Sequence, residues 1–144
     1  MIVGFGFTKI TAEKNESAKG KIDINNNVSV KDVAEDNLSL GKEKQTALKF
    51  SFEFASKYEP NLGKIIIEGN LLYMADAKKA KEILASWKKD KKVAQDIMAG
   101  LLNTILTKCN IQALIMSQDV NLPPPIPLPK VHMQQKQDSK NYIG

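Results

Sequence analysis

The stretch "ALKFSFEFASKYEPNLGKIIIEGNLLYM", residues 47–74, decides the fold because its apolar residues alternate with polar ones. In its first half every second residue is apolar, namely Leu48, Phe50, Phe52 and Phe54. The second half repeats the pattern with Ile65, Ile67, Leu71 and Tyr73. A period of two places such residues on one face of a strand. Pro60 and Gly63 interrupt the pattern, so we predict a long antiparallel hairpin over 47–74.

Two further strands are predicted before this hairpin. Residues 2–14 ("IVGFGFTKITAEK") are rich in β-branched and aromatic residues, and residues 19–36 place isoleucines and valines among polar side chains. The three asparagines at 25–27 predict a turn or bulge inside the second of these strands. Residues 35–45 are polar and predict a connection to the hairpin.

After the hairpin the apolar period becomes helical. Asp76 is a candidate N-cap, and a short helix is predicted over 77–89. Its apolar positions are Ala77, Ala80, Leu84 and Trp87. A longer helix is predicted from Lys91 to Met116, with a broad apolar stripe. The order of elements indicates an α+β fold, in which a four-stranded antiparallel sheet precedes a short helix, a long helix and a proline-rich extended segment.

The proline-rich segment is "NLPPPIPLPKV", residues 121–131, which holds five of the six prolines. Proline fixes φ and lacks a backbone N–H, so the segment is extended or polyproline II. It can be a disordered linker, a ligand for a partner's aromatic groove, or a strap packed on the protein's own fold. The spacers Ile126 and Leu128 are aliphatic, and the segment directly follows a helix. Both observations favour the strap and leave the other two interpretations open.

Side chains suited to catalysis or metal binding are scarce. His132 is the only histidine and follows the prolines, while Cys109 is the only cysteine and lies on the apolar stripe of the long helix. These counts exclude a multi-histidine metal site and an internal disulfide, and the position of His132 after the prolines disfavours its pairing with a nucleophile. We therefore expect no enzyme activity, no metal and no cofactor. We also expect a cytoplasmic location and no membrane association, because no signal sequence or long apolar run is present.

The net charge of +5 is concentrated in residues 76–92, which hold seven lysines and three acidic residues. The chain contains no arginine, the side chain best suited to bidentate phosphate and guanine contacts. A lysine-rich helix face is more often a solvated surface. The sequence therefore disfavours nucleic acid as a partner.

Two features concern apolar surface. The stripe of Phe50, Phe52 and Phe54 is either core or the floor of an apolar groove that holds extended peptides.

A sheet of four strands has two faces, and two helices cover one of them well. Ile66 and Leu72 then remain on the other face, so we expect a homodimer or homotetramer.

The segments "KFSFEFASKYEPNLGKIIIEGNLLY" (49–73) and "IMAGLLNTILTKCNIQALIM" (97–116), the latter running into "NLPPPIPLPKV", resemble SecB-like chaperones, in particular divergent archaeal relatives. The resemblance covers about residues 1–131, which we take as a single domain, and residues 132–144 are expected to be a disordered tail. It implies a dimer of dimers that binds unfolded or nascent polypeptides in long apolar grooves without ATP. It also implies that Leu122, Ile126 and Leu128 face the groove.

Two departures from the family pattern matter. Export chaperones of this type are acidic, whereas this chain is basic, which puts docking to an export motor in doubt. The lysine-rich helix over 77–89 is also inserted where bacterial members have little equivalent.

The sequence leads to one main hypothesis and one alternative, with nucleic-acid binding through the lysines of 77–92 as a third and disfavoured hypothesis that predicts a steep salt dependence. The main hypothesis is an ATP-independent holdase for unfolded or nascent chains, related to export or to an antitoxin. Its candidate client-binding residues are Phe50, Phe52, Phe54, Leu122, Ile126 and Leu128. The alternative is a non-enzymatic scaffold or adaptor that binds one specific protein partner.

Overall fold

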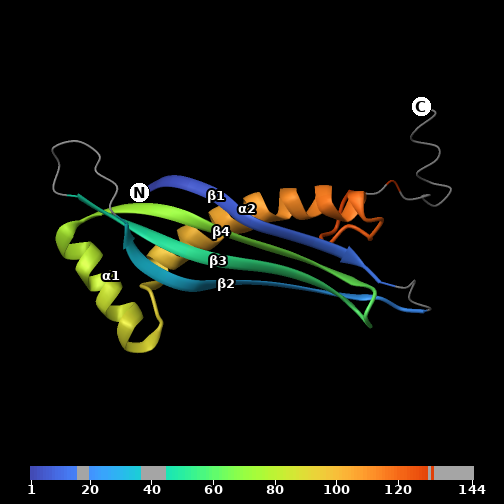
Figure 1. Ribbon diagram of the computed structural model, residues 1–144, viewed down its shortest axis with the longest axis horizontal. Coiled ribbons are helices and arrows are strands. Elements are labelled where there is room, and N and C mark those ends of the chain that lie inside the picture. Colours follow the sequence, from blue (N-terminus) through green and yellow to red (C-terminus); the bar gives the residue numbers. More distant parts are fainter. Residues whose placement is uncertain (16–19, 37–44, 130, 132–144) are drawn as a thin grey trace, which may run out of the picture.

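The protein consists of a four-stranded antiparallel sheet followed by two helices (Figure 1). A computed structural model describes residues 1–15, 20–36, 45–129 and 131. The elements are β1 (Ile2–Lys14), β2 (Asp23–Asp36), β3 (Gln45–Glu59), β4 (Gly63–Asp76), α1 (Ala77–Asp90) and α2 (Gln95–Asp119). The strand order in the sheet is β1-β4-β3-β2. The predicted α+β order is confirmed, while the predicted tail 132–144 and most of the connection 35–45 lie outside the described residues.

The hairpin of β3 and β4 forms the centre of the sheet, as its alternation predicts. Phe50 lies opposite Leu71 and Phe54 opposite Ile67, and all four side chains are fully buried. The turn closes at 60–62, where the Leu62 N–H donates to the Tyr58 carbonyl oxygen at 2.9 Å. Direct cross-strand pairs of this kind give both strands one buried face.

The outer strands form where predicted, but β2 begins only at Asp23 and its irregularity lies elsewhere. The expected turn or bulge at residues 25–27 is wrong, because all three asparagines pair without interruption along β3. The register shift falls at Lys31 instead, between Val30 and Asp32. An asparagine is accommodated inside the strand because the Asn26 side chain has its own hydrogen-bond partners, as described below.

The helix boundaries follow from their caps. The Lys79 N–H donates to Asp76 Oδ1 at 2.7 Å, which confirms Asp76 as the N-cap of α1. The long helix was expected to start at Lys91, but this residue ends α1 in a left-handed conformation, with φ of 59°. Its N–H donates to the Trp87 carbonyl oxygen at 2.8 Å, and α2 begins only at Gln95.

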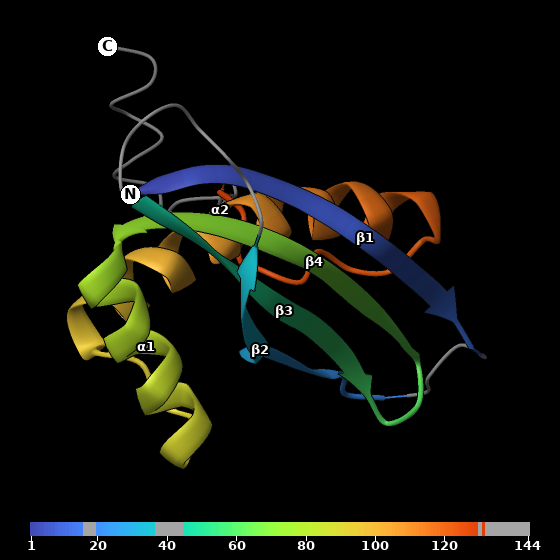
Figure 2. The same cartoon turned by 60° about the vertical axis from the view of Figure 1, so that its left-hand side comes forward.

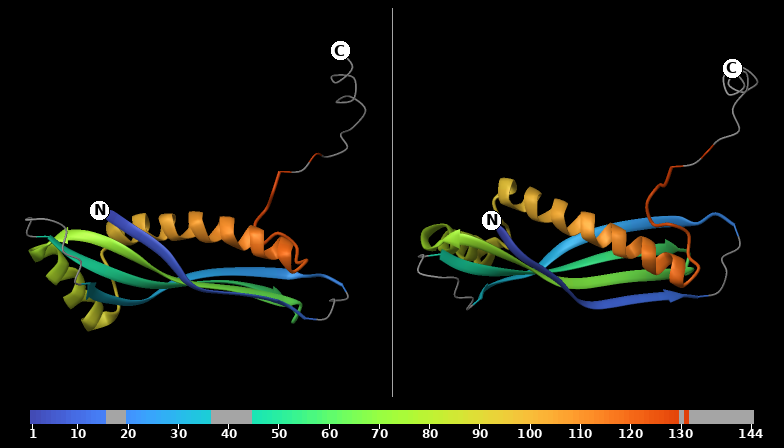
Figure 3. Two further views of the ribbon diagram at one scale, coloured as in Figure 1. Left: turned by 45° about the horizontal axis from the view of Figure 1, so that its top comes forward. Right: turned by 90° about the horizontal axis from the view of Figure 1, so that it is seen from above.

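The helices and the sheet share one hydrophobic core. Figure 3 shows α2 running along one face of the sheet, and Figure 2 shows α1 at one end of it. The buried residues of α2 recur at every fourth position, at Ile97, Leu101, Ile105, Cys109, Ala113 and Ser117. Cys109 behaves as a small buried hydrophobe, as expected, and burial raises the pKa of its thiol to about 12.

Neither helix described by the structure combines the length and apolar character needed to cross a membrane.

Candidate functional site

The proline segment lies on the sheet and is fastened to it through carbonyl oxygens. Tyr58 Oη donates to the Pro123 carbonyl oxygen at 2.6 Å, and Asn26 Nδ2 donates to the Pro125 carbonyl oxygen at 2.8 Å. Leu122 is buried at the start of the segment, with 6% of its surface exposed. Prolines offer acceptors but no backbone donors, so the sheet has to supply the donors. The predicted strap is confirmed, and we use "strap" for residues 122–129.

The two donors to the strap are themselves held in place. Ser56 Oγ donates to Asn26 Oδ1 at 2.6 Å, which leaves the Asn26 amide nitrogen free to donate to the strap. Tyr58 is 1% exposed, and burial raises the pKa of its hydroxyl to about 12. The hydroxyl therefore keeps its proton over the whole neutral range. Asn26, Ser56 and Tyr58 were not among the predicted site residues, although Ser56 and Tyr58 continue the alternation of β3.

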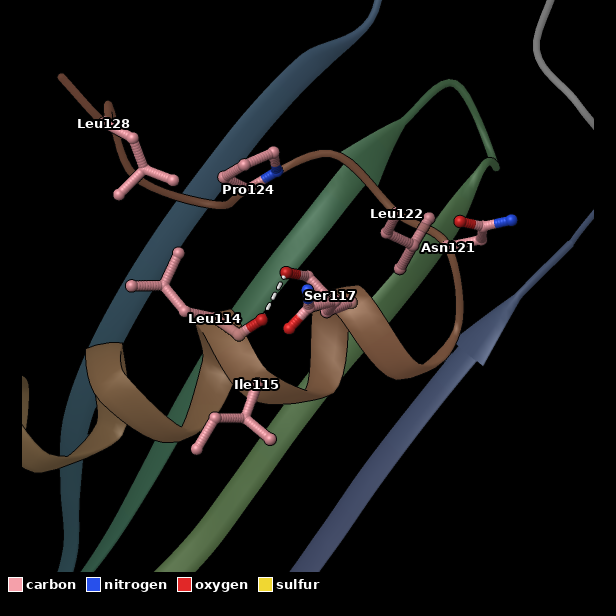
Figure 4. Close-up of a pocket in the computed structure, with 8 residues that line it drawn as sticks. Leu114, Ile115, Ser117, Asn121, Leu122, Pro124 and Leu128 are labelled. Atoms are coloured by element: carbon pink, nitrogen blue, oxygen red, sulfur yellow. Dashed lines mark hydrogen bonds between the residues drawn. The ribbon is translucent and has the colours of Figure 1, made fainter. Parts of the chain in front are cut away.

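An apolar hollow of about 390 Å³ opens between the C-terminal part of α2 and the strap (Figure 4). Its lining residues are Leu114, Ile115, Ser117, Gln118, Asn121, Leu122, Pro124 and Leu128. Ile115 is 48% exposed and Leu128 is 45% exposed, so solvent reaches large aliphatic side chains at this place. Concave apolar surfaces with a few polar groups at the rim are typical of ligand sites.

Comparisons with known proteins identify the fold. No protein-family model and no curated protein matches the sequence. One solved structure that matches is a Mycobacterium tuberculosis SecB-like chaperone in complex with a ChAD peptide from the HigA1 antitoxin. The match covers 94% of this chain and 92% of that chain, with a TM-score of 0.54 and 10% sequence identity. This chain has a SecB-like fold. The resemblance carried by 49–73 and 97–116 is thereby confirmed at the level of the fold.

A second hollow lies on the other side of the strap in this SecB-like fold. It has a volume of about 720 Å³ and is bounded by Ile24 and Asn26 of β2 and by strap residues 123–129. The strap therefore stands as a ridge between a hollow that faces α2 and a hollow that faces β2. Both hollows are lined largely by aliphatic side chains and proline rings.

The six predicted site residues do not form one surface in the SecB-like fold. Phe50, Phe52 and Phe54 are 0%, 2% and 0% exposed, and they belong to the core cluster. They do not line an open groove, because the helices pack on the face that carries them. The other three residues differ among themselves. Leu122 anchors the strap, Ile126 is partly buried, and Leu128 is exposed at the first hollow.

Leu114, Ile115 and Pro124 line the first hollow but were not among the predicted residues. The apolar stripe of the long helix was visible in the sequence. Which of its residues point away from the sheet depends on the crossing of α2 over the sheet, which the sequence pattern does not contain.

Proposed function

We propose that this protein is an ATP-independent holdase that binds extended apolar segments of unfolded or nascent polypeptides. The observation that carries the proposal is the apolar hollow between α2 and the strap. Ile115 and Leu128 stand there about half exposed, on a rigid frame anchored by buried Leu122. Large aliphatic side chains held open in a concave surface favour an apolar partner.

Client binding would rely on side chains more than on backbone pairing. The five prolines at 123–129 remove the backbone N–H from most of the strap and leave it only at Leu122, Ile126 and Leu128, so a client cannot pair along it as a continuous β-strand. Apolar client side chains would instead be buried against the hollows, at about 25 cal/mol per Å². Ordering a flexible client offsets much of this gain. We therefore expect modest affinity and low sequence selectivity, with no requirement for a nucleotide or any other cofactor.

The holdase would act as a homodimer or homotetramer in the cytoplasm. Support for self-association comes from Ile111 on α2, which is 57% exposed. A hollow of about 350 Å³ lies beside it, lined by Asn103, Thr104, Thr107 and Lys108 together with Ile111. A twofold axis near Thr107 would seat the Ile111 side chain of each copy in the hollow of the other.

The second candidate function is a scaffold or adaptor that binds one specific protein. It is favoured by the comparison structure, which contains a peptide from a single antitoxin. A selective adaptor would use the same apolar hollows but would hold one sequence much more tightly than others.

The test uses a reduced, slowly folding client whose aggregation is followed by light scattering. The protein should suppress aggregation at stoichiometric ratios, and Leu128→Ser should weaken the suppression, because it removes an aliphatic side chain from the hollow. Val131→Ser is the matched control, since Val131 is 98% exposed and lies outside both hollows. It should suppress aggregation as well as the wild type does.

Absence of suppression would contradict the holdase proposal. Equal loss in both variants would contradict the assignment to the hollow. Capture of a single partner at fixed stoichiometry, without binding to unfolded chains, would favour the adaptor.

A further inference from the structure

The segment 77–92 carries the whole net charge of the protein. It holds seven lysines against Glu82 and Asp90, which gives +5, whereas the remaining residues hold fourteen lysines and fourteen acidic residues. Composition alone favoured a solvated surface. The placement of these lysines on α1 gives two reasons to revise that interpretation.

The first reason is that the lysines form one outward face on a rigid platform. Ala80, Ile83 and Trp87 are buried and fix one side of α1 to the core. The other side carries four lysines that are all exposed, Lys78, Lys81, Lys88 and Lys89. The end of the segment is also held, because Ser86 Oγ donates to the Lys92 carbonyl oxygen at 2.9 Å.

The second reason is that part of this charge opposes helix stability. Lys88 and Lys89 lie in the last turn, where positive charge is favourable to the helix dipole. Lys78 and Lys79 lie at the opposite end, and the first turn contains no acidic residue. Lys78 and Lys81 are also like charges three positions apart. Among the described residues no ion pair involves an α1 lysine. Glu82 is exposed three and four positions after Lys79 and Lys78, but no ion pair joins it to either lysine. The charges within α1 therefore give its first-turn lysines little stabilisation.

The chemistry of the face limits the kind of partner. The apolar side of α1 is buried, so the helix has no apolar face to insert into a membrane. Exposed lysine–carboxylate pairs contribute little, which makes an acidic protein surface a weak partner. A nucleic-acid backbone is different, since each neutralised phosphate releases condensed counterions and adds affinity without burial of the lysine.

We propose that the outward face of α1 binds the phosphate backbone of structured RNA. The choice of RNA rests on the proposed function, because nascent clients emerge beside the folded RNA of the ribosome. Figure 1 shows α1 at one end of the sheet and the strap at the other, so RNA and a client can be bound at the same time. The role of the lysine-rich helix is then to keep the apolar hollows near emerging chains.

The test measures binding of the full chain to a short fluorescent RNA duplex by anisotropy, between ~50 and ~200 mM salt. The wild type should bind, with affinity that falls steeply with salt. A variant with Lys78→Gln, Lys81→Gln and Lys88→Gln should bind at least tenfold more weakly at low salt. The slope of the logarithm of its binding constant against the logarithm of salt concentration should be shallower by about 0.9 for each lysine removed. Glutamine has a helix propensity close to that of lysine, so α1 should stay folded.

The matched control removes the same charge elsewhere, through Lys9→Gln, Lys31→Gln and Lys57→Gln, at three exposed positions of the sheet. This control should change RNA affinity by less than about threefold, because lysines outside α1 would contribute only a screened, long-range attraction. Equal weakening in the two triple variants would overturn the proposal, and so would absence of RNA binding at low salt. Stronger binding to anionic lipid vesicles or to polyglutamate than to RNA would overturn it as well.

Aggregation suppression by the α1 variant should match that of the wild type. Loss of RNA binding can therefore be separated from failure of the holdase proposal.

Discussion

Tyr58 illustrates how one side chain of the sheet decides the position of the strap. It continues the apolar alternation of β3, yet it carries a hydroxyl that the strap needs, since Pro123 presents only a carbonyl oxygen there. Burial raises the pKa of this hydroxyl to about 12 from its ordinary value of 10. The hydroxyl therefore stays protonated, and can donate this hydrogen bond, well above neutral pH.

Tyr58→Phe should lower the free energy of unfolding by about 1 kcal/mol near neutral pH, because one hydrogen bond is lost. The wild type should also lose stability between pH 10 and about 12, since the unfolded chain releases the Tyr58 proton there while the folded chain retains it. This alkaline loss should be smaller in Tyr58→Phe but not absent, because the pKa of Cys109 is raised by burial too.

Urea denaturation at several pH values from neutral to about 11.5 measures both effects of the substitution. Tyr73→Phe, in the neighbouring strand of the same hairpin, is the control. An alkaline loss of equal size in the wild type and in Tyr58→Phe would contradict the assigned role of the hydroxyl.

At the scale of elements, the sequence predicted the local periods of strands and helices, and missed contacts between distant residues and one helix boundary. The alternation over 47–74 determined the buried faces of β3 and β4, because a period of two is a local property. The role of Asn26 was missed because its partner, Pro125, lies 99 positions further along the chain. The start of α2 was missed because the residues after Lys91 fit a helical pattern, although Lys91 itself ends α1 in a left-handed conformation.

At the candidate site, too, the sequence predicted one feature and missed another. The aliphatic spacers of the proline segment were enough to predict a strap on the protein's own fold. The stripe of Phe50, Phe52 and Phe54 was left as either core or the floor of a groove, because periodicity places these residues on one face but does not say which element covers that face. The structure places them in the core and leaves Ile115 exposed at the hollow instead.

The attachment of the strap to β2 can be tested with neighbouring asparagines. Asn26→Ala should lower the free energy of unfolding by about 2 kcal/mol, because it removes the donor to Pro125 and leaves the buried Ser56 hydroxyl without its acceptor. Asn25→Ala, one position earlier, should change the stability by less than about 0.5 kcal/mol, because Asn25 is exposed as Asn26 is but takes no part in the hydrogen bonds to Ser56 and Pro125. If urea denaturation gave the same change in unfolding free energy for both substitutions, the contact between Asn26 and the strap would contribute nothing to stability.

At the scale of the whole molecule, apolar surface and positive charge are separated. The two hollows lie beside the strap, while the lysines of α1 lie at the other end of the sheet (Figure 1). Apolar side chains that do not line these two hollows are also exposed, including Phe7 and Ile10 of β1 at 36% and 37%, and Ile111 of α2 at 57%. Their exposure on rigid elements supports the proposed self-association.

The proposed oligomer predicts a solution mass of two or four times the 16.0 kDa of one chain. Ile111→Ser should raise the dissociation constant roughly hundredfold, since a twofold contact loses one buried isoleucine from each copy. Sedimentation equilibrium over a range of concentrations measures both quantities. Val131→Ser is again the control, because Val131 is exposed but lies beyond the last helix, and it should leave the mass unchanged. A mass of 16.0 kDa at micromolar concentration would contradict the oligomer. Ile111 would then be an exposed side chain of a monomer and not a contact between copies.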